Sequence, residues 1–306
     1  MDKAEAAARA LAAGGLVILP TETVYGLGAD AANPAAVAAL FAAKGRPRFN
    51  PLIAHVADLD AAGRIAHLDS RAQALAEAFW PGPLTLVAPL RDPAAVCDLA
   101  RAGLDTVAVR APAHPLALQV LKAFGRAVVA PSANRSGRPS PTTYADAVEE
   151  TGAYAAAAID GGPCTIGLES AVVLVVPGPL RLLRPGGLDR AAIEAVAGPL
   201  AEAEAGDNQS PGRLALHYAP RAPLRLGAAT PTAGEAYLAF GPAQAGPGVF
   251  NLSPAADVRE AAANLFAYLR AADRLNPAAI AVAPIPEHGL GEAINDRLRR
   301  AAGFVG

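Results

Sequence analysis

The chain has 306 residues, of which 53% are hydrophobic and 18% are charged, and its formal net charge is −2. These values exclude an intrinsically disordered chain, and the nearly balanced charge gives no general attraction to nucleic acid or to an anionic membrane. The two cysteines, Cys97 and Cys164, form no CxxC pair or Cys/His cluster, which excludes a disulfide framework and a zinc finger and suits a reducing compartment.

The opening stretch, "MDKAEAAARALAAGG", predicts a helix. It is alanine-rich, carries Asp2 and Glu5 near its start, and closes on two glycines, whereas a signal peptide begins with basic residues. No apolar run along the chain reaches the length of a membrane span. We therefore expect a cytoplasmic protein.

Short apolar runs then alternate with helical patterns as far as residue 200. Strands are predicted at "GLVILP", "PLIAHV", "LTLVAPL", "TVAVRAP", "AVVAP", "AAIDG", "SAVVLVV" and "LRLLRPG". Helices are predicted to begin near Asn33, Ser70, His114, Thr142 and Asp189. Strands this apolar indicate a sheet covered on both faces, and therefore an α/β domain.

The pattern breaks at residues 206–223, which are polar, rich in turn formers and without either hydrophobic period. This composition predicts a linker. Strand-like "LRLG", "AYLAFG", "GVFNLS" and "AIAVAPIP" follow, with a long helix around "ADVREAAANLFAYLRAADRL" and a last helix from Gly291. We expect two domains, residues 1–205 and residues 224–306, joined by the linker.

The usual nucleotide and hydrolase signatures are missing: GxxxxGK[ST], GxGxxG, HExxH and GxSxG do not occur. What remains is a set of polar residues at predicted strand ends, where open α/β sheets bind ligands. The first set is "LPTETVYGLGAD", which is either a strand that ends in a tight turn or a strand that delivers hydroxyls to a ligand. Nothing local decides between the two.

"AAKGRPRFNPLIAHV" places cations between a helix end and a strand. The helix dipole accounts for Lys44, but Arg46, Arg48 and Asn50 together are suited to clamping phosphates. His55 interrupts an otherwise apolar strand, and a histidine in that setting is more often a core residue than a ligand contact.

Three further strands carry polar residues at their ends. Arg110 ends "DTVAVRAP" and requires an anionic partner, either a protein carboxylate or a substrate carboxylate. Glu169 and Ser170 begin one strand, and Arg184 ends another. Between them, "VVAPSANRSGRPSPT" is either a plain loop of turn formers or a loop that binds phosphate or ribose.

In chain order, "PTETVYGLG", "KGRPRFNPL" followed by His55, "VAVRAP", "PSANRSGRPSPT", "GLESAVV", "RPG" and "SPGRLALHYAP" resemble the motifs of the L-threonylcarbamoyladenylate synthases, the YrdC-like enzymes. The motifs cover residues 15–221, and the tail resembles the extra domain of the longer form. The resemblance implies an open twisted mixed α/β sheet with a concave ligand cavity, plus a small C-terminal α/β domain. It also implies synthesis of threonylcarbamoyl-AMP and pyrophosphate from L-threonine, bicarbonate and ATP, for N6-threonylcarbamoyladenosine modification of tRNA.

The resemblance further assigns roles to individual residues. The residues expected to contact L-threonine are Thr23, His55, Arg110, Ala130 through its backbone, and Ser170. Lys44 and Arg46 are the expected catalytic residues. Those expected to contact ATP are Arg46, Asn50, Thr106, Ser132, Ser140, Arg184 and Tyr218, with the linker closing over the site. Mg²⁺ is expected on the triphosphate, and no carboxylate cluster marks a dedicated protein site for it.

Two positions depart from the family pattern: Ala171 stands where threonine is common, and Arg213 stands where methionine is common. Both put fine substrate placement in doubt rather than activity. We expect the product to pass to the tRNA threonylcarbamoyl transferase machinery, with at most weak contact to tRNA and none to a membrane. The alternative functions are an RNA-binding YrdC-like module without synthase activity, which the 5% aromatic content disfavours, and a carbamoyl-transfer maturation factor, whose added zinc cysteines are missing.

Overall fold

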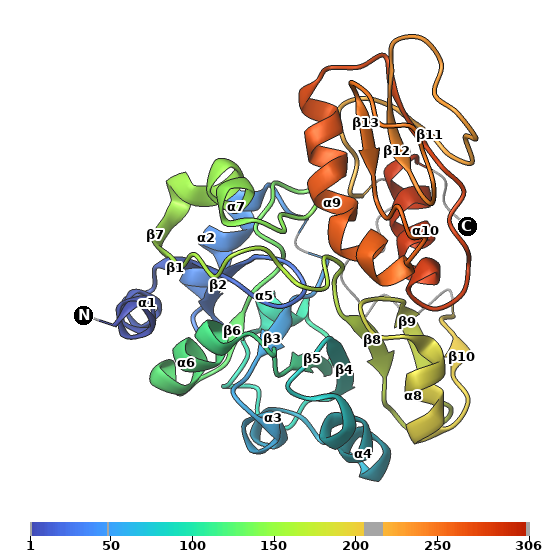
Figure 1. Ribbon diagram of the computed structural model, residues 1–306. Coiled ribbons are helices and arrows are strands. Elements are labelled where there is room, and N and C mark those ends of the chain that lie inside the picture. The colour runs from blue at the N-terminus through green and yellow to red at the C-terminus, as the bar shows by residue number, and fades with distance from the viewer. Residues whose placement is uncertain (1, 48, 205–216, 304–306) are drawn as a thin grey trace.

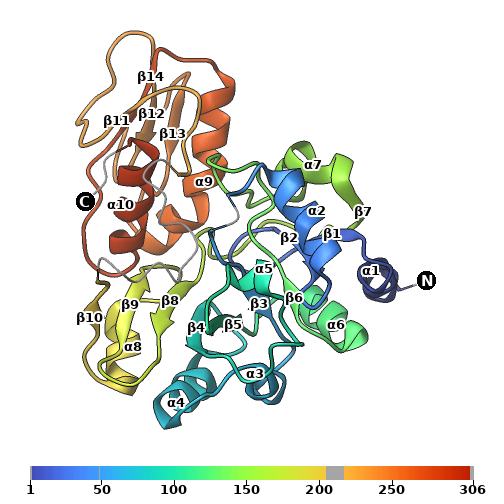
Figure 2. The same cartoon turned by 180° about the vertical axis from the view of Figure 1, so that it is seen from behind.

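The computed structural model describes residues 2–47, 49–204 and 217–303 (Figures 1 and 2). One sheet lies within residues 2–204 and a second within residues 217–303, and these two parts are called the N-terminal and C-terminal domains below. The predicted linker therefore lies outside the described residues as far as residue 216, as do Arg48 and Arg213. The C-terminal domain sits at the end of the large sheet that carries β8, β9 and β10, and helix α1 lies at the other end (Figure 1).

The N-terminal domain is built on a ten-stranded mixed sheet of order β10-β9-β8-β4-β5-β3-β6-β2-β1-β7. Its strands are β1 Leu16–Leu19, β2 Gly26–Asp30, β3 Ile53–His55, β4 Leu84–Pro89, β5 Thr106–Arg110, β6 Val128–Val129, β7 Ala155–Ala158, β8 Ala171–Leu174, β9 Arg181–Arg184 and β10 Ala201–Glu202. Its helices are α1 Lys3–Ala12, α2 Pro34–Lys44, α3 Leu59–Ile65, α4 Ser70–Phe79, α5 Asp98–Arg101, α6 Pro115–Phe124, α7 Tyr144–Thr151 and α8 Arg190–Ala197, with a 3₁₀ turn at Gly152–Tyr154.

The C-terminal domain has a four-stranded parallel sheet of order β11-β14-β12-β13. Its elements are β11 Leu224–Arg225, β12 Glu235–Ala239, β13 Val249–Asn251, α9 Val258–Arg274, β14 Ala279–Val282 and α10 Leu290–Ala301. This mixed sheet plus a small second α/β domain confirms the predicted fold class.

Helix α2 shows how local sequence sets an element that leads into the site. The Asn33 side chain accepts hydrogen bonds from the backbone N–H groups of Ala35 and Ala36, and Pro34 occupies the first turn. Gly45 ends the helix in the left-handed region, at φ 59°. The predicted start and end of this helix are therefore confirmed, and Lys44 is fixed in its last turn.

In the stretch "LPTETVYGLGAD" a strand ends in a turn, as in the first of the two readings, but a second strand that the sequence did not predict follows the turn directly. Strand β1 ends at Leu19, the threonines lie in a turn, and the glycine-rich "GLGAD" is itself strand β2, antiparallel to β1. Its glycines have a packing reason, because a Cβ on Gly28 would lie 3.0 Å from Cγ1 of Val128, and one on Gly26 would lie 3.1 Å from the Cβ of Ala130. Thr23 is therefore carried by the turn, and not by a strand as in the second reading.

One face of the sheet packs against helices in its first half and carries a small cluster of strand residues in its second half. Around β1 and β6, helices α1 and α6 form a core with residues such as Leu11, Val17 and Val120. Farther along the sheet, Ile53 of β3 and Val87 of β4 belong to a small separate cluster. Ile53 also lines a pocket, which places that pocket against the second half of the sheet.

Candidate active site

A polar pocket lies where β3, β5, β8 and β9 meet the turn after β1 and the loop after β6. It is lined by Thr23, Val24, Arg46, Leu52, Ile53, His55, Arg110, Ala130, Pro131, Ser132, Glu169, Ser170, Arg184, His217 and Tyr218. Three arginines with one carboxylate among the lining residues give it a cationic character, which suits anionic ligands.

The turn after β1 presents the Thr23 hydroxyl to this pocket. The Thr21 hydroxyl donates to the carbonyl of Val24 at 2.6 Å and lies 2.8 Å from the Thr23 hydroxyl. Because the single proton of Thr21 is used on that carbonyl, the bond between the two hydroxyls is donated by Thr23. The oxygen of Thr23 is thus left as a hydrogen-bond acceptor.

Arg110 at the end of β5 is buried and meets a protein carboxylate. Its Nη2 donates to Oε1 of Glu22 at 2.5 Å, and its Nε donates to the carbonyl of Gly82 at 3.1 Å. The other oxygen of Glu22 accepts from the backbone N–H of Ala113. Burial raises the pKa of the Glu22 carboxyl, but Arg110 and these hydrogen bonds outweigh it, so the pKa lies below its usual value.

His55, at the end of β3, is neutral in this setting. Its Nδ1 lies 3.2 Å from the carbonyl of Ile53, which can only accept, so Nδ1 carries the proton of that bond. Burial, together with the nearby Arg110, lowers the pKa of His55 to about 3. The structure therefore brings this histidine to the pocket as an uncharged imidazole.

The loop after α2 wraps around Arg46. Its guanidinium donates to the carbonyls of Asn50 and Pro51, at 3.4 Å and 3.2 Å, and burial lowers its pKa to about 10. Asn50 is buried without lining the pocket, and its Nδ2 has no partner among the described residues. An unpaired buried donor is costly, so this amide is suited to receive a ligand oxygen.

Lys44 does not line the pocket but holds the loop that does. Its ammonium donates to the carbonyls of Ser132 and Asn134, and Ser132 is a lining residue. Burial, with Arg46 nearby, lowers the pKa of Lys44 well below its usual value. The contact links the end of α2 to the loop after β6.

Ser170 and Arg184 meet on the floor of the pocket. The Ser170 hydroxyl lies 2.7 Å from that of Thr85, and Nη2 of Arg184 donates to the Ser170 carbonyl at 2.9 Å. Ala171, one of the departures from the family pattern, is buried on β8 immediately after Ser170. Nothing in the structure explains the change from threonine.

His217 and Tyr218, at the start of the C-terminal domain, line one side of the pocket. The rings of His217 and Tyr218 meet edge to face, with centroids 3.9 Å apart. Tyr218 is a non-glycine residue at φ 64°, an uncommon conformation that the surrounding structure must hold. His217 Nδ1 and the Tyr218 hydroxyl are buried without a partner among the described residues, and burial lowers the pKa of His217 to about 3.

Most of the predicted site residues therefore come together, from segments far apart in the sequence. Those that the structure does not bring to the pocket wall are Lys44, Asn50, Thr106 and Ser140. Thr106 begins β5, four residues from Arg110 and about 13 Å away along an extended strand. Ser140 instead donates to the carboxylate of Glu169, a lining residue.

His217 lines the pocket although the sequence did not single it out. The only signal for it is the "HYAP" motif, in which it precedes Tyr218. Within residues 2–47, 49–204 and 217–303, no group of three or more His, Cys, Asp or Glu side chains is placed to hold a metal ion. No helix in that same part of the chain is long and apolar enough to cross a membrane.

Comparison with known proteins identifies the class of protein. Residues 9–186 match a family described as "Telomere recombination", which groups Sua5, YciO and YrdC, and residues 188–303 match the family "Threonylcarbamoyl-AMP synthase, C-terminal domain". These two matches define a two-domain protein of the YrdC-like class.

Full-length relatives narrow the class further. Threonylcarbamoyl-AMP synthase of Bacillus subtilis is 38% identical, with 94% of this chain and 89% of that protein covered. The enzyme of the same name from Pyrococcus abyssi is 40% identical over 95% of this chain and 91% of that protein. The crystal structure of P. abyssi Sua5 complexed with L-threonine matches with a TM-score of 0.91 and 39% identity, covering 98% of this chain and 94% of that one.

The chain belongs to the threonylcarbamoyl-AMP synthase family, in the long form that carries both domains. It is an ATP-dependent nucleotidyltransferase that makes threonylcarbamoyl-AMP for tRNA modification.

Proposed function

We propose that the pocket with Arg110 on one side and Tyr218 on the other is the active site of this synthase. L-Threonine and ATP are held at separate ends of it. The observation that supports this most is a pair of buried polar atoms that have no partner among the described residues, His217 Nδ1 and the Tyr218 hydroxyl, in the wall of a cationic pocket. A polar ligand in the pocket would supply partners to both atoms.

The threonine end lies at Thr23, His55, Arg110, the backbone of Ala130, and Ser170. Arg110 pairs with the threonine carboxylate while its Nη2 stays on Glu22, since a guanidinium has five N–H donors. The acceptor oxygen of Thr23 and the uncharged ring of His55 suit the amine, which must be neutral to act as a nucleophile.

The ATP end lies at Arg46, Asn50, Ser132, Arg184 and Tyr218, with His217 added to the predicted set. Arg46, in the pocket wall, faces the phosphates, where negative charge grows during the reaction. The unpaired Nδ2 of Asn50 lies buried in the same loop and keeps its assignment to the phosphates as a prediction. Lys44 acts by holding Ser132 and Asn134 in place, while Ser140 acts on Glu169. Thr106 keeps its assignment to the adenylate only as a prediction.

The chemistry follows from this arrangement. The threonine amine attacks the carbon of bicarbonate, water leaves, and the new N-carboxylate attacks the α-phosphorus of ATP, so that pyrophosphate departs with the bonding electrons. The residues of this chain contribute positioning and charge stabilisation, without a covalent intermediate. Fixing both substrates in one pocket is the larger contribution, because it converts a three-component reaction into an intramolecular one.

The remaining assignments concern ligands and context. Mg²⁺ would enter bound to the triphosphate, because Glu169 in the pocket wall and Glu22 behind Arg110 are already held by arginines. We assign residues 1–205 to the catalytic domain and residues 224–306 to the second domain, joined by a linker of which residues 206–216 lie outside the described residues. The product passes to the tRNA threonylcarbamoyl transferase machinery in the cytoplasm.

A pair of variants tests the two ends separately. Arg110→Ala is expected to raise the KM for threonine by on the order of 100-fold, because a buried carboxylate contact is lost, with the KM for ATP changed only a few-fold. Arg46→Ala is expected to lower kcat and raise the KM for ATP, with a smaller effect on threonine. Pyrophosphate release at varied threonine and ATP gives both constants, and equal effects of Arg110→Ala on both KM values would contradict the assignment.

A further inference from the structure

The C-terminal domain delivers a buried arginine to the wall of the active site. Arg297 on α10 is 1% exposed, and its Nε donates to Oε2 of Glu169 at 2.8 Å. Its Nη2 donates to the carbonyl of Pro185, the residue after Arg184, at 3.0 Å. Its guanidinium carbon lies 5.2 Å from the centre of the Tyr218 ring, a cation–π distance. Arg297 therefore contacts two pocket-lining residues and the neighbour of a third.

Glu169 connects Arg297 to the loop on the other side of the site. One carboxylate oxygen accepts from Arg297 and the other accepts from the Ser140 hydroxyl, so a single side chain joins the C-terminal domain to the loop after β6. Burial raises the pKa of Glu169, but Arg297, Arg184 and the Ser140 bond lower it to about 2 overall. The carboxylate is thus charged, satisfied on both oxygens and fixed in orientation.

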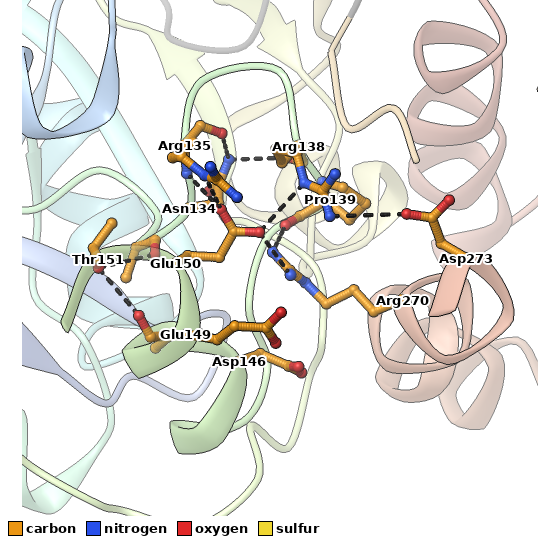
Figure 3. Close-up of polar contacts among 12 residues, drawn as sticks. Asn134, Arg135, Arg138, Pro139, Asp146, Glu149, Glu150, Thr151, Arg270 and Asp273 are labelled. Carbon is orange, nitrogen blue, oxygen red and sulfur yellow. Dashed lines mark hydrogen bonds and ion pairs between the residues drawn. The ribbon is translucent and has the colours of Figure 1, made fainter. Parts of the chain in front are cut away.

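A second buried arginine, Arg270, contacts the same loop (Figure 3). Arg270 on α9 is 3% exposed at its side chain and pairs at 3.0 Å with Glu150 on α7, which is 2% exposed. It also donates to the carbonyl of Pro139, directly before Ser140. Glu150 in turn accepts from the backbone N–H of Arg135 and from Nε of Arg138, so the whole loop is tied to this carboxylate.

The interface is also a shared apolar core. Val24 and Leu168 of the N-terminal domain pack in one cluster with Phe266 and Ile294 of the C-terminal domain. Asp273 on α9 accepts from the backbone N–H groups of Arg221 and Ala222 at 2.8 Å and 3.0 Å, just after Tyr218. Both the loop and the segment that carries Tyr218 are therefore set by α9 and α10.

Resting on the proposed function, we propose that Arg297 is a positioning residue for the ATP end of the active site, acting through Glu169 and Tyr218. The C-terminal domain is in this sense part of the active site, because the wall that meets the nucleotide is oriented from α10. Besides Glu169, Tyr218 and the carbonyl of Pro185, Arg297 pairs with Asp296, and none of these contacts involves Thr23, His55, Arg110 or Ser170. The threonine end is therefore expected to depend on Arg297 less than the ATP end does.

The test compares full-length Arg297→Met and Arg297→Lys with Arg299→Met. Arg299 is on the same helix, but its side chain is 48% exposed and pairs only with Glu287 in the described structure, which makes it the matched control. We expect Arg297→Met to raise the KM for ATP about tenfold or more, because the loss leaves a buried carboxylate unpaired. The KM for threonine should change less than about twofold, since the contacts of that end remain. Arg297→Lys keeps the charge and should recover part of the loss, and Arg299→Met should match the wild type.

The pKa of Glu169 gives a second readout, the pH dependence of the KM for ATP, which would not change if Arg297 only stabilised the fold. In Arg297→Met its pKa should rise, so the KM for ATP should become strongly pH-dependent on the acidic side, and the double variant Glu169→Gln with Arg297→Met should lose this dependence. Thermal unfolding of each variant separates a folding defect from a kinetic one, and Arg297→Lys carries the test if Arg297→Met does not fold.

Two results would overturn the proposal: unchanged KM for ATP in a folded Arg297 variant, or equal rises in both KM values. Wild-type pyrophosphate release that does not depend on threonine would instead contradict the proposed function, whatever the Arg297 variants do.

Discussion

At the scale of single residues, the guanidinium of Arg110 has two anionic partners, one from the protein and one from the proposed substrate. Glu22 meets it at 2.5 Å in the structure, and the threonine carboxylate is the second anion in the proposed complex. Both side chains are nearly inaccessible, at 4% and 9% exposure, so the pair is a buried one whose separation is costly. The carboxylate of Glu22 offsets the cost of burying the charge of Arg110, and the threonine carboxylate accepts from the remaining N–H donors of Arg110.

Glu22→Gln tests this balance. The substitution leaves Arg110 with an uncharged partner, so the free energy of unfolding should fall by about 3 kcal/mol. Because the threonine carboxylate then supplies the missing negative charge, threonine should raise the unfolding temperature more in Glu22→Gln than in the wild type. Thermal unfolding with and without threonine measures both effects. An equal or smaller threonine shift in the variant would show that Arg110 does not meet the substrate carboxylate.

At the scale of elements, the segment before β8 depends on a close approach of backbone. Gly187 donates its N–H to the carbonyl of Glu169 at 2.8 Å, next to Gly186. A Cβ on Gly186 would lie 2.2 Å from the backbone N of Ala171 and 2.5 Å from the carbonyl oxygen of Glu169. Only glycine therefore lets the end of β9 lie against the segment that carries Glu169 and Ser170.

Gly186→Ala should move that segment and disturb both ends of the site. We expect a loss of about 1–3 kcal/mol in the free energy of unfolding, as for other overpacked positions, with a marked fall in kcat. Gly63→Ala on α3 is the control, because a Cβ there meets nothing within 4 Å and a helix interior favours alanine by about 1 kcal/mol. Urea unfolding and pyrophosphate release measure the two effects, and a Gly186→Ala enzyme with wild-type kcat would contradict the account.

The elements also show what sequence can and cannot predict. Helix α2 was predictable because its caps, Asn33 and Gly45, are local to the chain. Strand β2 was missed because its glycines, which usually indicate a turn, serve close packing against β6.

In the candidate site, too, some residues could be predicted from the sequence and others could not. Motif resemblance placed Thr23, His55, Arg110, Ser170 and Arg184, and all of them line the pocket. Their protein partners could not be predicted, because they depend on tertiary contacts between segments distant in sequence. Glu22 and Arg110 lie 88 residues apart, and Glu169 and Arg297 lie 128 residues apart.

At the scale of the whole molecule, burial of two neutral histidines makes the fold sensitive to acid. The pKa of His55 and that of His217 are each lowered from 6.5 to about 3, chiefly because burial disfavours the imidazolium. Between these values the unfolded chain binds protons that the folded chain does not. Their contribution to stability is therefore complete above pH 6.5 and is lost as the pH falls toward 3.

The free energy of unfolding should fall below pH 6.5 by up to about 1.4 kcal/mol per pH unit for each histidine. His217→Gln should reduce this slope, while His288→Gln, at an exposed position, should leave it unchanged. Urea unfolding at several pH values between 7.5 and 5 measures the slope. A slope in His217→Gln equal to that of the wild type would show that His217 is not held neutral in the folded state.

In the proposed complex one pocket holds threonine and ATP together, so that neither reacts alone. The most direct test is pyrophosphate release from ATP by the full-length protein, with threonine and bicarbonate omitted in turn. We expect release only when both threonine and bicarbonate are present, and a large loss of release in Arg110→Ala at limiting threonine. Release that continues without threonine would contradict the account.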